Sequence, residues 1–177
     1  MLNFAEVFMK NIIILLTFCL ISCSKNSQVH PPVGGLLSQK DLEISRNRSR
    51  DLNQNERNQI KSWIQNQNEK FYPMAMNYWV NKEDLISKPK KLDGTSVSYQ
   101  YDIYDFDNVK LYPESVIKKN VQLGKFEDLK AVENVVRYLK SGEEATLLVP
   151  SVLAFGTYGD NKKIPSDLPV IIKIKVF

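Results

Sequence analysis

The sequence predicts an α+β domain in which an antiparallel sheet packs against one amphipathic helix. Residues 96–104 alternate between apolar and polar side chains, as a half-buried strand does. Residues 169–177 are rich in β-branched side chains that alternate with lysines, which predicts a closing strand. Residues 125–140 repeat apolar side chains at helical spacing. The repeated side chains, expected to face the sheet and form the core, are Phe126, Leu129, Val132, Val136 and Leu139.

The remaining strands are shorter and are bounded by turn residues. Residues 71–80 predict a first strand. Residues 105–108 predict a turn, after which residues 109–112 return as a hairpin partner. Gly142 is expected to end the helix in a left-handed cap, and a strand at residues 145–149 follows.

An additional helix is predicted ahead of the sheet. Asn53 is a suitable N-cap and Glu56 stands at the capping-box position. Ile60, Trp63 and Ile64 form a narrow apolar stripe, so we expect this helix to pack lightly on the domain or to bind a partner.

The N-terminus reads as a bacterial lipoprotein signal. Met9 and Lys10 precede a short apolar run, which ends in Leu-Ile-Ser-Cys at Cys23. This sequence resembles the box whose cysteine is acylated, so we expect a lipid anchor and a periplasm-facing protein in the cell envelope. The alternative is a buried apolar helix with a chance cysteine. Residues 1–8 fit poorly before such a signal, which favours a start at Met9 over Met1.

These features divide the chain into four parts. Residues 1–22 are the predicted signal peptide, 23–50 a flexible tether, 51–72 the N-terminal helix and 73–177 the main domain.

Composition excludes several classes of function. The formal net charge is only +4 and the basic residues are spread out, so the sequence contains no basic patch of the kind that binds nucleic acids. The two cysteines and the single histidine all precede the predicted domain. Within that domain we therefore expect neither a metal site nor catalysis by histidine or cysteine.

The connection between the last two strands has a distinctive order of residues. It contains Pro150, the triplet Ala-Phe-Gly at 154–156, Gly159 and then Ile164-Pro165. That order resembles the FKBP family, the macrolide-binding peptidyl-prolyl isomerases, and the similarity extends over residues 94–177. The resemblance implies a curved antiparallel sheet wrapped around one short helix.

The upstream architecture resembles a narrower group. A lipoprotein signal, polar tether, helix and aromatic strand before such a domain are similar to the gliding-motility-associated isomerase lipoproteins of gliding bacteria. Tyr158-Gly159-Asp160 followed by Lys163-Ile164 is similar to their form of the loop.

The implied chemistry is rotation about prolyl amides in proline-containing polypeptide clients, without a cofactor. The barrier of about 18–20 kcal/mol comes from amide resonance. An apolar cleft with a few donors lowers it by favouring the twisted amide. The resemblance implies that Tyr101 and Phe155 are catalytic and that the backbone amide of Leu129 binds a ligand carbonyl. The implied substrate-binding residues are Leu111, Tyr112, Leu129, Val132, Ile164 and Ile172.

Several positions depart from the family pattern. Val132 replaces the tryptophan at the pocket floor, and Phe155 replaces a tyrosine whose hydroxyl reaches a ligand carbonyl. Tyr112 replaces a deep aspartate and is expected to fill part of the pocket. Ile172 replaces an aromatic residue and Asp128 a valine at the helix entry. Two hypotheses follow: an isomerase that helps envelope or motility proteins fold, or a catalytically weak chaperone or structural component of the motility apparatus.

Overall fold

The structure is a computed structural model that describes residues 38–125 and 128–177. The chain divides into two units, residues 1–39 and 40–177, and the second contains the sheet. The predicted signal peptide, Cys23 and Phe126 lie outside the described residues. No helix within the described ranges is long and apolar enough to cross a membrane.

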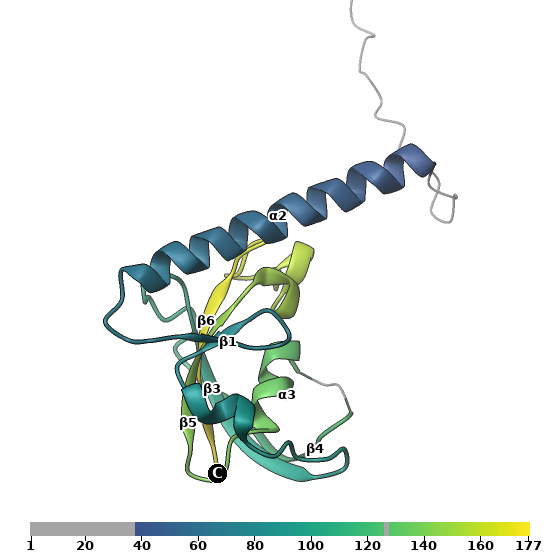
Figure 1. Ribbon diagram of the computed structural model, residues 1–177. Helices are drawn as coiled ribbons and strands as arrows, with labels where there is room; N and C mark the ends of the chain where they lie inside the picture. The colour runs from purple at the N-terminus through teal and green to yellow at the C-terminus, as the bar shows by residue number, and fades with distance from the viewer. Residues whose placement is uncertain (1–37, 126–127) are drawn as a thin grey trace, which may run out of the picture. The chain divides into compact units, whose positions relative to one another are not determined.

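The described chain forms one antiparallel sheet of six strands in the order β1-β2-β5-β6-β3-β4 (Figure 1). The strands are β1 (Tyr72–Pro73), β2 (Trp79–Val80), β3 (Ser96–Tyr104), β4 (Val116–Gln122), β5 (Glu144–Val149) and β6 (Val170–Val176). The helices are α2 (Gln39–Gln65) and α3 (Lys130–Val136), with 3-10 turns η1 (Glu83–Ser87), η2 (Ser151–Leu153) and η3 (Gly156–Tyr158). The predicted α+β class and antiparallel sheet are confirmed.

Both faces of the central strands are buried, each under a different helix. In β5, Leu147 belongs to the core cluster that contains α3, whereas its neighbour Leu148 belongs to a second cluster with Ile60 of α2. Ile172 and Ile171 of β6 divide between the two clusters in the same way. Because successive side chains of a strand point to opposite faces, the two helices cover opposite sides of β5 and β6.

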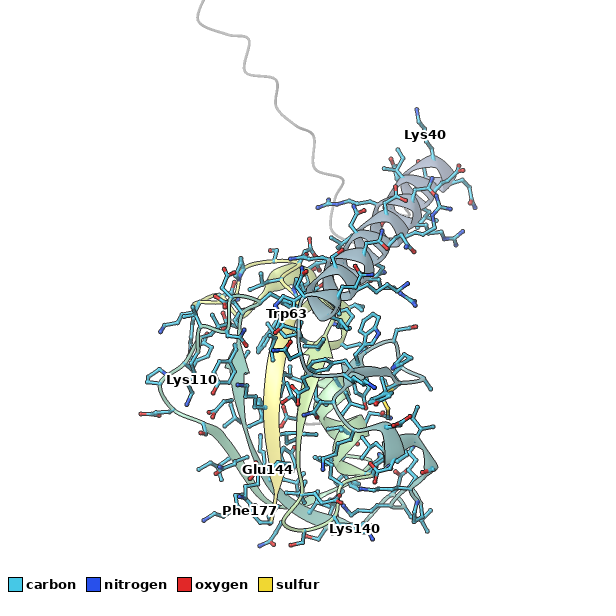
Figure 2. The ribbon with its side chains drawn as sticks, turned by 60° about the vertical axis from the view of Figure 1, so that its left-hand side comes forward. Lys40, Trp63, Lys110, Lys140, Glu144 and Phe177 are labelled. Atoms are coloured by element: carbon cyan, nitrogen blue, oxygen red, sulfur yellow. The ribbon has the colours of Figure 1, made fainter. Side chains whose placement is uncertain are left out.

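Trp63 fixes the C-terminal half of α2 to this second face. Its Nε1 donates to the Phe106 carbonyl oxygen at 2.7 Å, and its ring meets the rings of Phe71 and Phe106 edge to face. Figure 2 shows Trp63 against the sheet and Lys40 at the other end of the same helix, away from the strands. The side chains of residues 43–50 are exposed.

The predicted start of the N-terminal helix is wrong. α2 begins at Gln39, so the part of the tether from residue 39 to residue 50 is helical, and the helix ends at Gln65. No glycine or proline interrupts residues 39–65, so nothing in this stretch stops a helix that starts early. Asn53 is therefore inside the helix, and Glu56 is a buried residue of its second half.

The central helix is shorter than predicted. α3 spans only Lys130–Val136, and Gly142 lies in the turn before β5 instead of capping a helix. Lys91 explains the early end: its backbone N–H donates to the Arg137 carbonyl at 2.9 Å and its Nζ to the Val136 carbonyl at 2.9 Å. The last carbonyls of α3 are thus bound by a distant segment instead of by a further turn of helix.

Two strand pairings differ from the prediction. Residues 71–80 are two short strands joined by a turn, in which Asn77 adopts a positive φ of 65°. β3 pairs with β4 on one side and with β6 on the other, whereas residues 109–112 contribute only one isolated bridge, between Tyr104 and Lys110. The predicted strand at 96–104 is confirmed with the same bounds, and the turn after it is closed by Asp105 Oδ1, which accepts two backbone N–H groups.

Candidate active site

A cleft of about 840 Å³ opens between β3, the connection to β4, the start of α3 and the β5–β6 connection. Apolar and aromatic side chains form much of its surface, and three carboxylates and a lysine supply the charged groups. Its lining residues are Tyr101, Ile103, Tyr112, Pro113, Glu114, Ser115, Val116, Asp128, Leu129, Phe155, Asp160 and Lys162. A concave, largely apolar site with a few convergent polar groups is typical of a small-ligand or peptide site.

Two tyrosines of β3 converge on one carboxylate. The Tyr101 hydroxyl donates to Asp128 Oδ1 at 2.7 Å, and the Tyr99 hydroxyl donates to Oδ2 at 2.9 Å. The two residues are two apart in the strand, so their rings share a face and lie stacked, with centroids 6.4 Å apart. Burial, and then the hydrogen bond to Asp128, raise the pKa of Tyr101 well above its ordinary value. Tyr101 is therefore a neutral donor at physiological pH.

The backbone amide of Leu129 is also engaged by this carboxylate. Leu129 N donates to Asp128 Oδ1 at 2.7 Å, the same oxygen that accepts from Tyr101. The donor that the resemblance assigns to a ligand carbonyl is thus already hydrogen-bonded inside the protein. A ligand carbonyl must compete with a carboxylate for it, and hydrogen bonds to charged acceptors are the stronger kind.

Asp160 organises the loop on the other side of the cleft. Its Oδ1 accepts the backbone N–H groups of Lys162, Lys163 and Ile164 at 2.9, 3.1 and 2.9 Å. Its Oδ2 accepts the Tyr112 hydroxyl. Burial opposes the charged form of Asp160, but these four hydrogen bonds outweigh it and hold the pKa of the carboxyl below its usual value.

Gly159 allows this loop to fold back on itself. It has a φ of +64°, and a Cβ there would collide with the carbonyl oxygen of Ile164. Only glycine combines this backbone conformation with so close an approach.

A buried side chain of α2 is hydrogen-bonded to the segment that leads into Phe155. The carboxylate of Glu56, which is 3% exposed, accepts the Ser151 backbone N–H at 2.7 Å and the Ser151 hydroxyl at 2.6 Å. Ser151 begins η2, which directly precedes the stretch containing Phe155. Glu56 thus links α2 to the wall of the cleft.

The structure brings together half of the residues that the sequence assigned to the site. Tyr101, Tyr112, Leu129 and Phe155 line the cleft. Leu111 is half-buried beside the core but is not part of the lining. The remaining three are at most 2% exposed and belong to the core instead of the cleft surface: Val132, Ile164 and Ile172.

Sequence reasoning missed the two central carboxylates. In the sequence, Asp128 stands out only as a departure from a family valine, and Asp160 only as part of a loop motif. The sequence feature that could have identified Asp128 is its charge at the start of a helix whose other inward-facing positions are apolar. Tyr112 does not merely fill space, because its hydroxyl binds Asp160 and Lys163 Nζ lies 5.5 Å from the centre of its ring.

Comparisons with known proteins point to one family. Residues 87–177 match the family model described as FKBP-type peptidyl-prolyl cis-trans isomerase, which is about half of the chain. A peptidyl-prolyl cis-trans isomerase structure from Pseudomonas syringae pv. tomato is 14% identical, with a TM-score of 0.50, over 81% of this chain and 97% of that one. The crystal structure of AtFKBP13 is 16% identical, with a TM-score of 0.47, over 60% of this chain and 95% of that one. No curated protein sequence matches this chain.

Proposed function

The chain belongs to the FKBP-type peptidyl-prolyl cis-trans isomerase family, and we propose that it acts as a lipid-anchored isomerase for proline-containing clients in the cell envelope. The observation that carries this proposal is the cleft that Tyr101, Leu129 and Phe155 line within the matched domain.

The cleft suits rotation about an amide bond. Rotation removes the resonance of the planar amide, so a weakly polar surface destabilises the dipolar planar form more than the twisted one. Ile103, Val116, Leu129 and Phe155 offer such a surface to a substrate proline. The Tyr101 hydroxyl is held in place by Asp128, which pre-organises the polar side of the cleft.

An isomerisation assay tests the proposal directly. The chain should accelerate cis-trans exchange in a proline-containing peptide, measured by NMR exchange spectroscopy. Phe155→Asp should abolish the acceleration, because it places a charge on the apolar wall. Tyr158→Asp is the matched control: it lies in the same loop but is 84% exposed and should leave activity unchanged. A folded parent protein that shows no acceleration would refute the enzymatic proposal.

One observation favours a second candidate, a weak isomerase that works mainly as a client-binding chaperone or structural component. The backbone N–H of Leu129 already donates to Asp128, so this donor is not free to bind a ligand carbonyl. In that case client binding survives Phe155→Asp, and Phe155→Tyr, which adds a hydroxyl, gives no gain in turnover. An isomerase with a working cleft should instead gain activity from the added donor.

The cellular setting is supported by the sequence of the N-terminus. Cys23 closes a short apolar run as an acylated cysteine does, and the upstream architecture resembles that of gliding-motility lipoproteins. We therefore expect clients among envelope or gliding-motility proteins. Cys23→Ser should release the protein from the membrane fraction or leave the signal uncleaved. Fractionation and processing identical to the parent would refute the anchor.

A further inference from the structure

Asp128 places a negative charge in the cleft that no ion pair offsets. Its hydrogen-bond donors, the hydroxyls of Tyr99 and Tyr101 and the Leu129 amide, are all neutral. Across residues 38–125 and 128–177, no lysine, arginine or histidine forms a salt bridge with it. Asp160, by contrast, is surrounded by three backbone N–H groups and a hydroxyl. Of the two half-buried carboxylates in the cleft, Asp128 therefore has fewer hydrogen-bond donors, whereas the third carboxylate, Glu114, is exposed to water.

The carboxylate also has capacity for a further donor. A carboxylate offers about four acceptor positions, and three hydrogen bonds occupy Asp128. A neutral prolyl carbonyl gains little here, because it must displace the carboxylate from its donors. A cationic side chain adds a charge-assisted hydrogen bond without displacing any of them.

We propose that Asp128 is a specificity-determining residue that favours peptides with lysine or arginine next to the proline. This proposal rests on the proposed isomerase function of the same cleft. Lys162 also lines the cleft, but it is exposed, where salt and water screen its charge, and Glu114 in the same lining opposes it.

Binding of matched peptides tests this preference without requiring turnover. The full chain, purified in detergent, is titrated by calorimetry with proline peptides that carry Lys, Gln or Glu beside the proline. The Lys peptide should bind about fivefold more tightly than the Gln peptide at low salt, and the Glu peptide more weakly. The Lys preference should shrink as salt is added.

Substitutions of Asp128 test whether its carboxylate causes the preference for the Lys peptide. Asp128→Asn keeps an acceptor for the tyrosines and should bring the Lys-to-Gln ratio close to one, whereas Asp128→Glu should retain most of the preference. Glu144→Gln removes an exposed carboxylate that pairs with Lys175 toward the end of the sheet away from α2 (Figure 2). This control should leave the ratio unchanged.

The outcomes separate this proposal from the proposed activity. A parent protein that binds the three peptides equally, prefers the Glu peptide or binds none of them overturns the specificity proposal. An unchanged ratio in a folded Asp128→Asn variant does so as well. If the Gln peptide is isomerised without any Lys preference, only the specificity proposal fails. If the Lys preference depends on Asp128 but no peptide is isomerised, only the proposed isomerase activity fails.

Discussion

The buried hydrogen bonds between Glu56 and Ser151 allow us to predict how much free energy of unfolding the domain loses when Glu56 is replaced. Glu56→Ala removes two hydrogen bonds to a charged acceptor, at 2.7 and 2.6 Å, and leaves the Ser151 N–H buried without a partner. Hydrogen bonds to charged groups contribute about 1.5–3 kcal/mol each, so we expect the two bonds together to account for a loss of about 3–6 kcal/mol. That is a large part of the roughly 5–15 kcal/mol that stabilises a typical domain. Glu56→Gln, which keeps one acceptor, should lose less.

Urea denaturation of the soluble chain from Ser24 onward measures this loss. With a slope of about 2 kcal/mol per molar urea, the midpoint of Glu56→Ala should fall by roughly 1.5–3 M. Glu43→Ala in the exposed half of α2 is the control and should stay within about 0.5 kcal/mol of the parent. If Glu56→Ala unfolds at the same urea concentration as Glu43→Ala, the contact does not hold α2 to the cleft wall.

Three further predictions concern the core and the loop. Val136→Asp buries an unpaired charge at a position that is 0% exposed and should abolish folding; an unchanged thermal midpoint would contradict the core assignment. Gly159→Ala should destabilise the loop and weaken peptide binding, because its Cβ collides with the Ile164 carbonyl; unaltered affinity would argue against that geometry. The folded-state pKa of Asp160 is lowered, so its contribution is present above the unfolded value of about 3.9 and is lost as pH falls through the folded value. NMR signals of the loop should shift in that acidic range, and Asp160→Asn should remove the effect.

Local patterns predicted β3, β5 and β6, but they missed β4 and treated β1 and β2 as one strand. The alternation at 96–104 gave the bounds of β3, and the loop around Gly159 follows from a conformation that glycine adopts readily. The length of α3 was not predictable in this way. Its end depends on Lys91, which is far away in the sequence, and no periodicity within the helix reveals that contact.

The polar part of the site was the hardest to predict for the same reason. Tyr101 was identified, but its partner Asp128 comes from another element, so only the fold brings them together. Glu56 is the converse case, in which a local pattern predicted a role that the tertiary structure does not use. Its spacing from Asn53 suggested a capping box, but tertiary burial uses the carboxylate for Ser151 instead.

The seven-residue length of α3 has a consequence for the order in which the domain assembles. A helix of this size cannot nucleate alone in water, so it has to wait for the surface on which it packs. That surface is itself built late, because β3 pairs with β6 from the far end of the chain, as Tyr101 does with Ile174. Such non-local pairing slows folding. The part of the cleft that Asp128 and Leu129 form at the start of α3 is therefore among the last parts of the domain to assemble. A chain lacking its final strand should contain no cleft at all.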